Sequence, residues 1–129
     1  MIKDINELEV YSLAMDFGEI VWETVSHWDH FSRQTIGVQL INACDSISAN
    51  ISEGFGRFHF NENKHFCYYA RGSLFETKTW LIKSYKRGLI DTALYSELME
   101  KTSTIGKRLN NYIRSIGTIR NPITGDNAK

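Results

Sequence analysis

The sequence has almost no proline, since its single Pro122 lies close to the carboxyl end of 129 residues. Proline interrupts helices, so its absence from the first 121 residues permits long helices there. Cysteine is nearly as scarce. Cys44 and Cys67 are too few for a four-cysteine metal site or a disulfide framework, and we expect both to be reduced core residues.

Long apolar runs are also missing, because no segment approaches the roughly 20 apolar residues that cross a bilayer. The first seven residues lack the basic-then-apolar order of a signal peptide. Both absences predict a cytoplasmic protein without a membrane partner. Hydrophobic residues make up 42% and charged residues 23% of the chain, as is usual for a globular domain. We expect one domain over residues 1–117 and a polar, flexible tail over 118–129.

Apolar residues recur at steps of three and four along most of the chain, which predicts helices. The expected helices cover about residues 6–28, 32–55, 62–87 and 91–117. Ser32 and Asp91 are suitable N-caps, and Gly54, Gly56 and Gly88 are suitable stop signals. Long helices with short loops predict an all-α, up-down-up-down antiparallel four-helix bundle. In that topology the first and third helices lie diagonally opposite each other.

Each expected helix has one apolar stripe. The first helix is predicted to bury Leu8, Tyr11, Met15, Gly18, Trp22 and Val25. The second is predicted to bury Ile36, Leu40, Ala43, Cys44, Ile47 and Ile51. The third carries Phe66, Ala70, Ser73, Leu74, Thr77, Trp80 and Leu81, and the fourth carries Leu94, Leu98, Ile105, Leu109, Tyr112 and Ile116. These stripes supply the core of the bundle.

Two segments resemble a known family. They are Ser46-Ile47-Ser48-Ala49-Asn50-Ile51-Ser52-Glu53-Gly54-Phe55-Gly56-Arg57 and Gly72-Ser73-Leu74-Phe75-Glu76. Both are similar to the signature of the four helix bundle proteins encoded by intervening sequences in bacterial 23S ribosomal RNA genes, which are related to the accessory variability proteins of diversity-generating retroelements. The similarity extends over about residues 6–117, and the opening Leu8 to Ala14 shares it.

The resemblance implies a four-helix subunit that forms a homopentameric ring or barrel. It also implies, for the retroelement members, nucleic-acid binding beside a reverse transcriptase. Those members are strongly basic, whereas this chain has a formal net charge of zero. We therefore expect a non-enzymatic scaffold or accessory protein that assembles with itself. The alternative is an accessory factor that binds RNA or DNA, with a reverse transcriptase or ribosomal RNA as its partner.

The signature residues have structural interpretations. Glu53 lies at a helix C-terminus, where an anion is unfavourable, so we expect it to form a buried ion pair with Arg57 or, as a second candidate, Arg71. Gly72 lies in mid-helix at a cost of about 1 kcal/mol, and close approach of Gly72 and Ser73 to the second helix explains it. Asn50 is expected to be a buried hydrogen-bond partner. No separate role is predicted for Glu76.

No residue pattern specifies catalysis or a cofactor. Glu62 and His65 match one Glu-x-x-His motif, but a di-iron bundle needs two such motifs and two further glutamates. His27 and His30 are predicted at the opposite end of the bundle from His59, so they cannot share a metal with it. We therefore predict no catalytic site, no cofactor site and no metal site. We expect that the protein is not an enzyme.

Charge is segregated along the chain. Residues 1–62 hold ten acids and three bases, a net charge of −7, and residues 63–129 hold five acids and twelve bases, a net charge of +7. The charges recur every seven residues: Glu9, Asp16 and Glu23 on the first helix, Lys64, Arg71 and Lys78 on the third, and Lys101 with Arg108 and Lys107 with Arg114 on the fourth. Such spacing places each set on one helix face.

Three interpretations of these stripes stay open. In the first, the stripes are helix faces exposed to solvent. In the second, the acidic stripe of one subunit meets the third-helix stripe of its neighbour in a head-to-tail ring. In the third interpretation the basic stripes bind phosphates, chiefly through Lys101, Lys107, Arg108 and Arg114 on the fourth helix.

Overall fold

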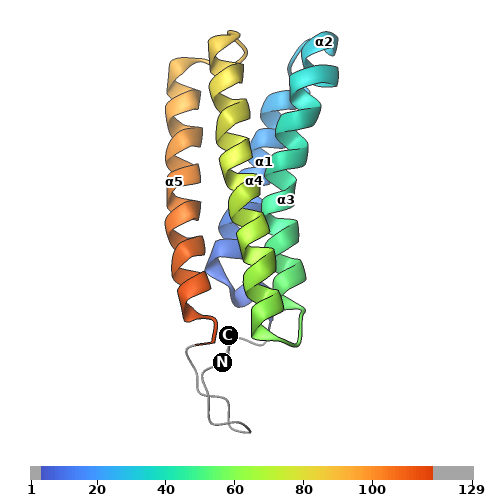
Figure 1. Ribbon diagram of the computed structural model, residues 1–129. Helices are drawn as coiled ribbons and strands as arrows, with labels where there is room; N and C mark the ends of the chain where they lie inside the picture. Colours follow the sequence, from blue (N-terminus) through green and yellow to red (C-terminus); the bar gives the residue numbers. More distant parts are fainter. Residues whose placement is uncertain (1–3, 118–129) are drawn as a thin grey trace, which may run out of the picture.

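The computed structural model describes residues 4–117, and these form an antiparallel helical bundle (Figure 1). The described elements are a 3-10 turn over Ile5–Glu7, α1 (Glu9–Ser26), α2 (His30–Ser32), a π-helical turn over Arg33–Gly37, α3 (Val38–Phe55), α4 (Phe60–Lys86) and α5 (Thr92–Ser115). Since α2, the π turn and α3 follow one another without a break, the bundle has four long rods. The predicted all-α four-helix fold is confirmed. The predicted tail over 118–129 lies outside the described residues.

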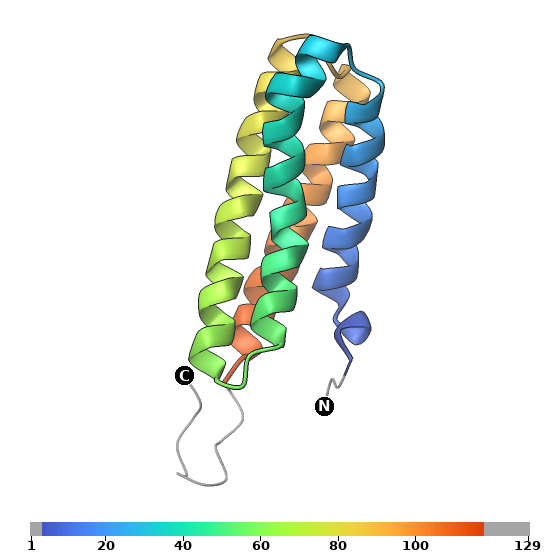
Figure 2. The ribbon, with the colours of Figure 1, turned by 90° about the vertical axis from the view of Figure 1, so that its right-hand side faces the viewer.

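The four rods are arranged as the up-down-up-down topology requires. α1 packs against α3 and α5, and α4 packs against the same two helices, so that α1 and α4 occupy opposite corners (Figures 1 and 2). Short connections reverse the chain between rods. Gly88 adopts φ +76° between α4 and α5, a conformation that favours glycine, and the next rod starts where the Asp91 side chain accepts a hydrogen bond from Leu94 N at 2.8 Å.

The second rod starts two residues earlier than predicted. Asp29, and not Ser32, is its N-cap, and the Asp29 carboxylate accepts a hydrogen bond from Ser32 N at 3.2 Å. The π turn ends at Gly37, where an added Cβ would lie 2.8 Å from Val25 Cγ1 of α1. The missing side chain therefore lets the rod approach α1 closely.

The core runs along the whole axis of the bundle and is almost entirely aliphatic. Its largest fully buried hydrophobic side chains are Phe17, Val21, Leu40, Ile47, Ile51, Leu74, Leu81, Leu98, Ile105 and Leu109. Thr77 and Thr102 are also fully buried, and their hydroxyls donate to the carbonyls of Ser73 at 2.8 Å and Met99 at 2.6 Å. These bonds within a helix let polar side chains enter the core without an unpaired group.

Both cysteines are buried and unpaired, as predicted for core residues. Burial, reinforced by nearby Asp45, raises the pKa of Cys44 to about 12, and burial alone raises the pKa of Cys67 to about 11. Both groups are therefore thiols at neutral pH, with little of the thiolate that reacts or binds metal.

The predicted stripe of α1 is partly wrong. Met15 and Trp22 are 43% and 57% exposed, whereas Leu8, Gly18 and Val25 are buried as expected. The core row instead contains Val10, Ala14, Phe17 and Val21. Both rows have helical spacing, so periodicity alone did not determine which of them faces inward.

The predicted close approach at Gly72 is also wrong. Gly72 is exposed, and an added Cβ would meet nothing within 4 Å. The close approach lies at Gly54, where an added Cβ would lie 2.7 Å from Asn63 Oδ1 and 3.0 Å from Phe66 Cβ of α4. α3 ends at Phe55, as predicted, with Gly56 as its C-cap, so Gly54 lies inside the last turn. Its lack of a side chain is needed for packing of α3 on α4.

These two glycines give opposite predictions for one substitution. Gly72→Ala should stabilise the fold by about 0.5–1 kcal/mol, because alanine has the higher helix propensity and the site is open. Gly54→Ala should destabilise it by about 1–3 kcal/mol, because the new methyl group displaces the Asn63 backbone. Urea unfolding of both variants measures the two changes. Equal effects at the two positions would contradict the packing described for Gly54.

Candidate functional site

A polar groove lies between α4 and α5. It has a volume of about 420 Å³ and is lined by Tyr68 and Arg71 of α4 and by Asn110, Ile113 and Arg114 of α5. Two lining residues are cationic and none is a carboxylate. The groove therefore combines positive charge, one amide and one exposed aromatic ring.

Arg71 is held inside this groove by two neighbours. Its Nη1 donates to Asn110 Oδ1 at 3.2 Å, and its guanidinium carbon lies 5.1 Å from the centroid of the Tyr68 ring. Arg114 donates a short hydrogen bond to Asn111. Within residues 4–117, neither arginine forms an ion pair with a carboxylate. The positive charges are thus oriented by neutral groups and keep their full attraction for an anion.

Two further bases share the helix face on which Arg71 lies. Lys64 and Lys78 lie seven residues before and after Arg71, so all three predicted residues are on one face of α4. Lys78 Nζ lies 5.0 Å from the centroid of the exposed Phe75 ring. The three bases therefore alternate with aromatic rings along this face of α4.

The seam between α1 and α5 contains acids and bases of the predicted charge stripes. Glu9 Oε1 of α1 pairs with Arg108 Nη1 of α5 at 2.7 Å. Asp16 and Lys101 line a hollow of about 400 Å³ between the same two helices. One interpretation of the stripes placed Glu9 and Asp16 against a neighbouring subunit, and another placed Arg108 and Lys101 against nucleic acid. Within one chain, these acids and bases lie along the same pair of helices. Lys107 is exposed and outside this seam.

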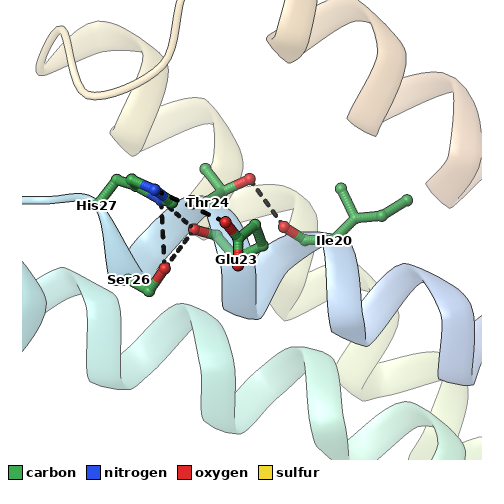
Figure 3. Close-up of polar contacts among 5 residues, drawn as sticks. All are labelled: Ile20, Glu23, Thr24, Ser26 and His27. Carbon is green, nitrogen blue, oxygen red and sulfur yellow. Dashed lines mark hydrogen bonds and ion pairs between the residues drawn. The ribbon is translucent and has the colours of Figure 1, made fainter.

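The third residue of the acidic stripe, Glu23, belongs to the C-terminal end of α1 (Figure 3). Its carbonyl oxygen lies 2.8 Å from His27 Nδ1 and accepts a 2.6 Å hydrogen bond from Ser26 Oγ. The Glu23 carboxylate lies 3.6 Å from His27 Nε2. His27, weighed above as a metal ligand, thus caps the helix that carries it.

An apolar groove lies between α1 and the second rod, on the side of the bundle opposite to the polar groove of α4 and α5. It has a volume of about 390 Å³ and is lined by Trp22, Val25, Ser26, Arg33, Val38, Ile41 and Asn42. Trp22 and Val38 are exposed although both are large and hydrophobic. A concave apolar surface of this kind is typical of a site that another molecule covers.

Two carboxylates lie one helical turn from residues that line this groove: Asp45 is three residues after Asn42, and Glu19 is three residues before Trp22. Asp45 lies against α1, because an added Cβ on Gly18 would be 3.2 Å from Asp45 Oδ1. Partial burial, and then the charge of Glu19, raise the pKa of Asp45 above its ordinary value. The ionised form of Asp45 is therefore unfavourable in the folded subunit.

The corner between α3 and α4 contains the predicted Glu53–Arg57 pair, but the pair is exposed and not buried. Arg57 Nη2 lies 2.9 Å from Glu53 Oε1, its Nη1 lies 3.4 Å from Glu62 Oε2, and its guanidinium carbon is 4.8 Å from the Phe66 ring centroid. Water screens both ion pairs, so they contribute little to stability. Asn50 is half-buried, and its side-chain amide donates to Ser46 O at 2.8 Å.

The remaining signature residues form no common site. Ser73 is half-buried and accepts the Thr77 hydrogen bond through its carbonyl, while Glu76 is exposed. Within residues 4–117, no three histidine, cysteine, aspartate or glutamate side chains lie together as metal ligands. No helix within the same residues has both the length and the hydrophobicity that crossing a membrane requires.

Sequence reasoning missed the aromatic half of the α4 surface. Tyr68 and Phe75 were not assigned to the third-helix stripe, although each follows a base by four residues. Helical spacing would have placed them beside Lys64, Arg71 and Lys78. The apolar groove was missed because Trp22 was assigned to the core.

Comparison with known proteins supports the sequence resemblance. Residues 6–111 match the sequence model of the 23S rRNA-intervening sequence proteins. The fold is similar to the crystal structure of a protein with unknown function from the S23 ribosomal protein family of Bacteroides thetaiotaomicron, with a TM-score of 0.74, 19% identity, and coverage of 82% of this chain and 99% of that one. A comparison with curated proteins finds no match.

The pKa of Asp45 predicts how stability changes with pH. Because the folded state raises this pKa, ionisation of Asp45 lowers stability as pH rises through the range between its unfolded and folded pKa values. Asp45→Asn should therefore increase the free energy of unfolding at pH 7, and the gain should disappear near pH 3, where both states are protonated. Urea unfolding at a series of pH values measures this. Asp16→Asn is the control, and an equal gain in it would refute the assignment.

Proposed function

The chain belongs to the 23S rRNA-intervening sequence protein family, and from this premise we propose that it is a non-enzymatic subunit that assembles into a cyclic homo-oligomer. Five subunits is the number that the family resemblance implies. In this role the assembly serves as a scaffold or accessory protein. The apolar groove between α1 and α3 is the observation that carries the proposal.

This groove has the composition of a subunit contact. Trp22, the most enriched residue type at binding hot spots, is 57% exposed beside Val38 and Ile41. In a ring of more than two subunits each contact joins two different surfaces, so a second copy would cover this groove with another part of its own surface. Such a contact between unlike surfaces closes into a ring when the rotation between subunits allows it.

Charge favours a second copy as the occupant. α1 and α3 together carry six acids and no base, whereas α4 and α5 together carry nine bases and four acids. Each subunit therefore has an acidic side, which contains the groove, and a basic side. Attraction between unlike sides sets the orientation of neighbours and speeds their association.

Removing the exposed indole tests this assembly. Trp22→Ser should reduce the oligomer to smaller species at micromolar concentration, because truncation of a central aromatic anchor costs about 2 kcal/mol or more per contact. Light scattering coupled to size-exclusion chromatography measures the mass. Phe58→Ser is the control, because Phe58 is 92% exposed in the loop between α3 and α4 and lines no groove described here. A Trp22→Ser variant with the wild-type mass would exclude this contact.

A second candidate function is nucleic-acid binding by an accessory factor, with RNA, DNA or a reverse transcriptase as partner. The observation that favours it is the groove between α4 and α5, in which neither Arg71 nor Arg114 pairs with a carboxylate of residues 4–117. Of the α5 bases predicted to contact nucleic acid, Arg108 is paired with Glu9 and is less available to a phosphate. Lys107 and Arg114 are the α5 bases that stay exposed and outside the seam with α1.

The second candidate predicts binding that depends strongly on salt. Affinity for labelled RNA or DNA should fall steeply between 50 and 200 mM salt, since each neutralised phosphate releases counterions. Charge neutralisation at Lys107 and Arg114 should lower the affinity and make the salt dependence shallower. Fluorescence anisotropy at the two salt concentrations gives both quantities. Absence of binding at low salt would remove this candidate and leave the assembly proposal intact.

A further inference from the structure

Bases and aromatic rings alternate along one face of α4. The order is Lys64, Tyr68, Arg71, Phe75 and Lys78, with steps of four, three, four and three residues. These steps keep all five side chains on one helix face. At 1.5 Å per residue the row is about 21 Å long, and we call these five residues the α4 row.

Each aromatic ring in the row lies against the next base. The Arg71 guanidinium carbon is 5.1 Å from the Tyr68 centroid, and Lys78 Nζ is 5.0 Å from the Phe75 centroid. The rings are nevertheless 45% and 59% exposed. The cations therefore orient the rings without covering them, which leaves ring surface available for another planar group.

The polar groove completes the centre of the row from the side of α5. Asn110 uses its Oδ1 to accept from Arg71, so its amide NH₂ can donate to a ligand. Arg114 adds a second guanidinium from the other helix. A phosphate between Arg71 and Arg114 would accept from two planar donors, the geometry that arginine favours for this anion.

The chemistry of the row selects one class of ligand. An acidic peptide would use the cations and leave the exposed rings without a function, and a duplex presents its phosphates while its bases stay stacked inside. An unpaired strand presents both phosphates and free base faces. Basic grooves with aromatic stacking residues are typical of sites that bind single strands.

We propose that the α4 row and its groove bind single-stranded nucleic acid, with phosphates at Lys64, Arg71 and Lys78 and bases stacked on Tyr68 and Phe75. This inference rests on the second candidate function and adds the class of nucleic acid and the residues that recognise it. It also assigns the stripe Lys64, Arg71 and Lys78 to a ligand and not to a neighbouring subunit.

Stacking is tested at Tyr68. A labelled 12-nucleotide oligouridylate, titrated with the full chain and followed by fluorescence anisotropy, should bind Tyr68→Leu about 5- to 150-fold more weakly than wild type, the range for loss of one stacked base. Leucine keeps apolar bulk and helix propensity but has no ring. Tyr69→Leu is the matched control, because Tyr69 is adjacent, 58% exposed and outside the row; its affinity should be unchanged.

Phosphate contact is tested at Arg71. Arg71→Gln should weaken binding and reduce the slope of log affinity against log salt by about 0.7, the value for one phosphate on a single strand. Lys83→Gln makes the same change in net charge on the same helix, with Lys83 placed over Trp80 outside the row. Equal effects of the two variants would show attraction by net charge alone and overturn the assignment.

The remaining outcomes separate this inference from the functions on which it rests. No binding of the oligouridylate at 50 mM salt overturns both the row and the second candidate. Binding that is insensitive to Tyr68→Leu, or equal for a duplex, overturns the row alone. Displacement of the strand by polyglutamate at equal charge would identify an acidic-polymer site and also overturn it. The oligomer of Tyr68→Leu must have the wild-type mass in light scattering. A smaller mass would show that the α4 row is a contact between subunits.

Discussion

The close packing of α3 on α4 determines which surfaces the molecule presents. At Gly54 the two helices approach so closely that an added Cβ would lie within 3.0 Å of α4 atoms. This contact sets the rotation of α4 about its own axis. Leu74 and Leu81 then face the core, and Tyr68 and Arg71 at the centre of the α4 row line the groove with α5. A different rotation of α4 would move Tyr68 and Arg71 away from Asn110 and Arg114, which form the other wall of this groove.

The same geometry divides the charges. α1 and α4 occupy opposite corners, so an acid of α1 meets bases only across its seam with α5. There Glu9 pairs with Arg108, and Asp16 lies beside Lys101. Arg71 of α4 lies on the side of that helix that faces α5 and not on the side that packs against the acidic α3. At the corner between α3 and α4, Arg57 pairs with Glu53 of α3 and Glu62 of α4. A net charge of zero is therefore compatible with a strongly basic face, because neutralisation happens on the other side of α5.

The fold was predictable because long stretches lack proline and carry helical spacing, so only one topology fits four rods with short loops. The rotation of individual helices was less predictable. α1 has two apolar rows, and the sequence favoured Met15 and Trp22 as strongly as Val10 and Phe17, although only the second row is buried. Gly72 and Gly54 look equivalent in the sequence, yet only Gly54 meets another helix. Contacts such as Glu9–Arg108 depend on these rotations, which explains why the charge stripes were found and their partners were not.

The exposed apolar residues that the sequence assigned to the core or left unassigned are the ones that a function must explain. Trp22 and Val38 lie in the groove between α1 and α3, and Tyr68 and Phe75 lie between bases on α4. The two sets differ in their neighbours, and each therefore suits a different partner. Trp22 is accompanied by aliphatic groups and fits the packed surface of a second subunit, whereas the rings of α4 are separated by cations and fit planar groups that carry negative charge. The proposed ring contact uses the groove of one subunit and part of the basic side of its neighbour. A strand can bind in the same assembly if that contact lies outside the α4 row.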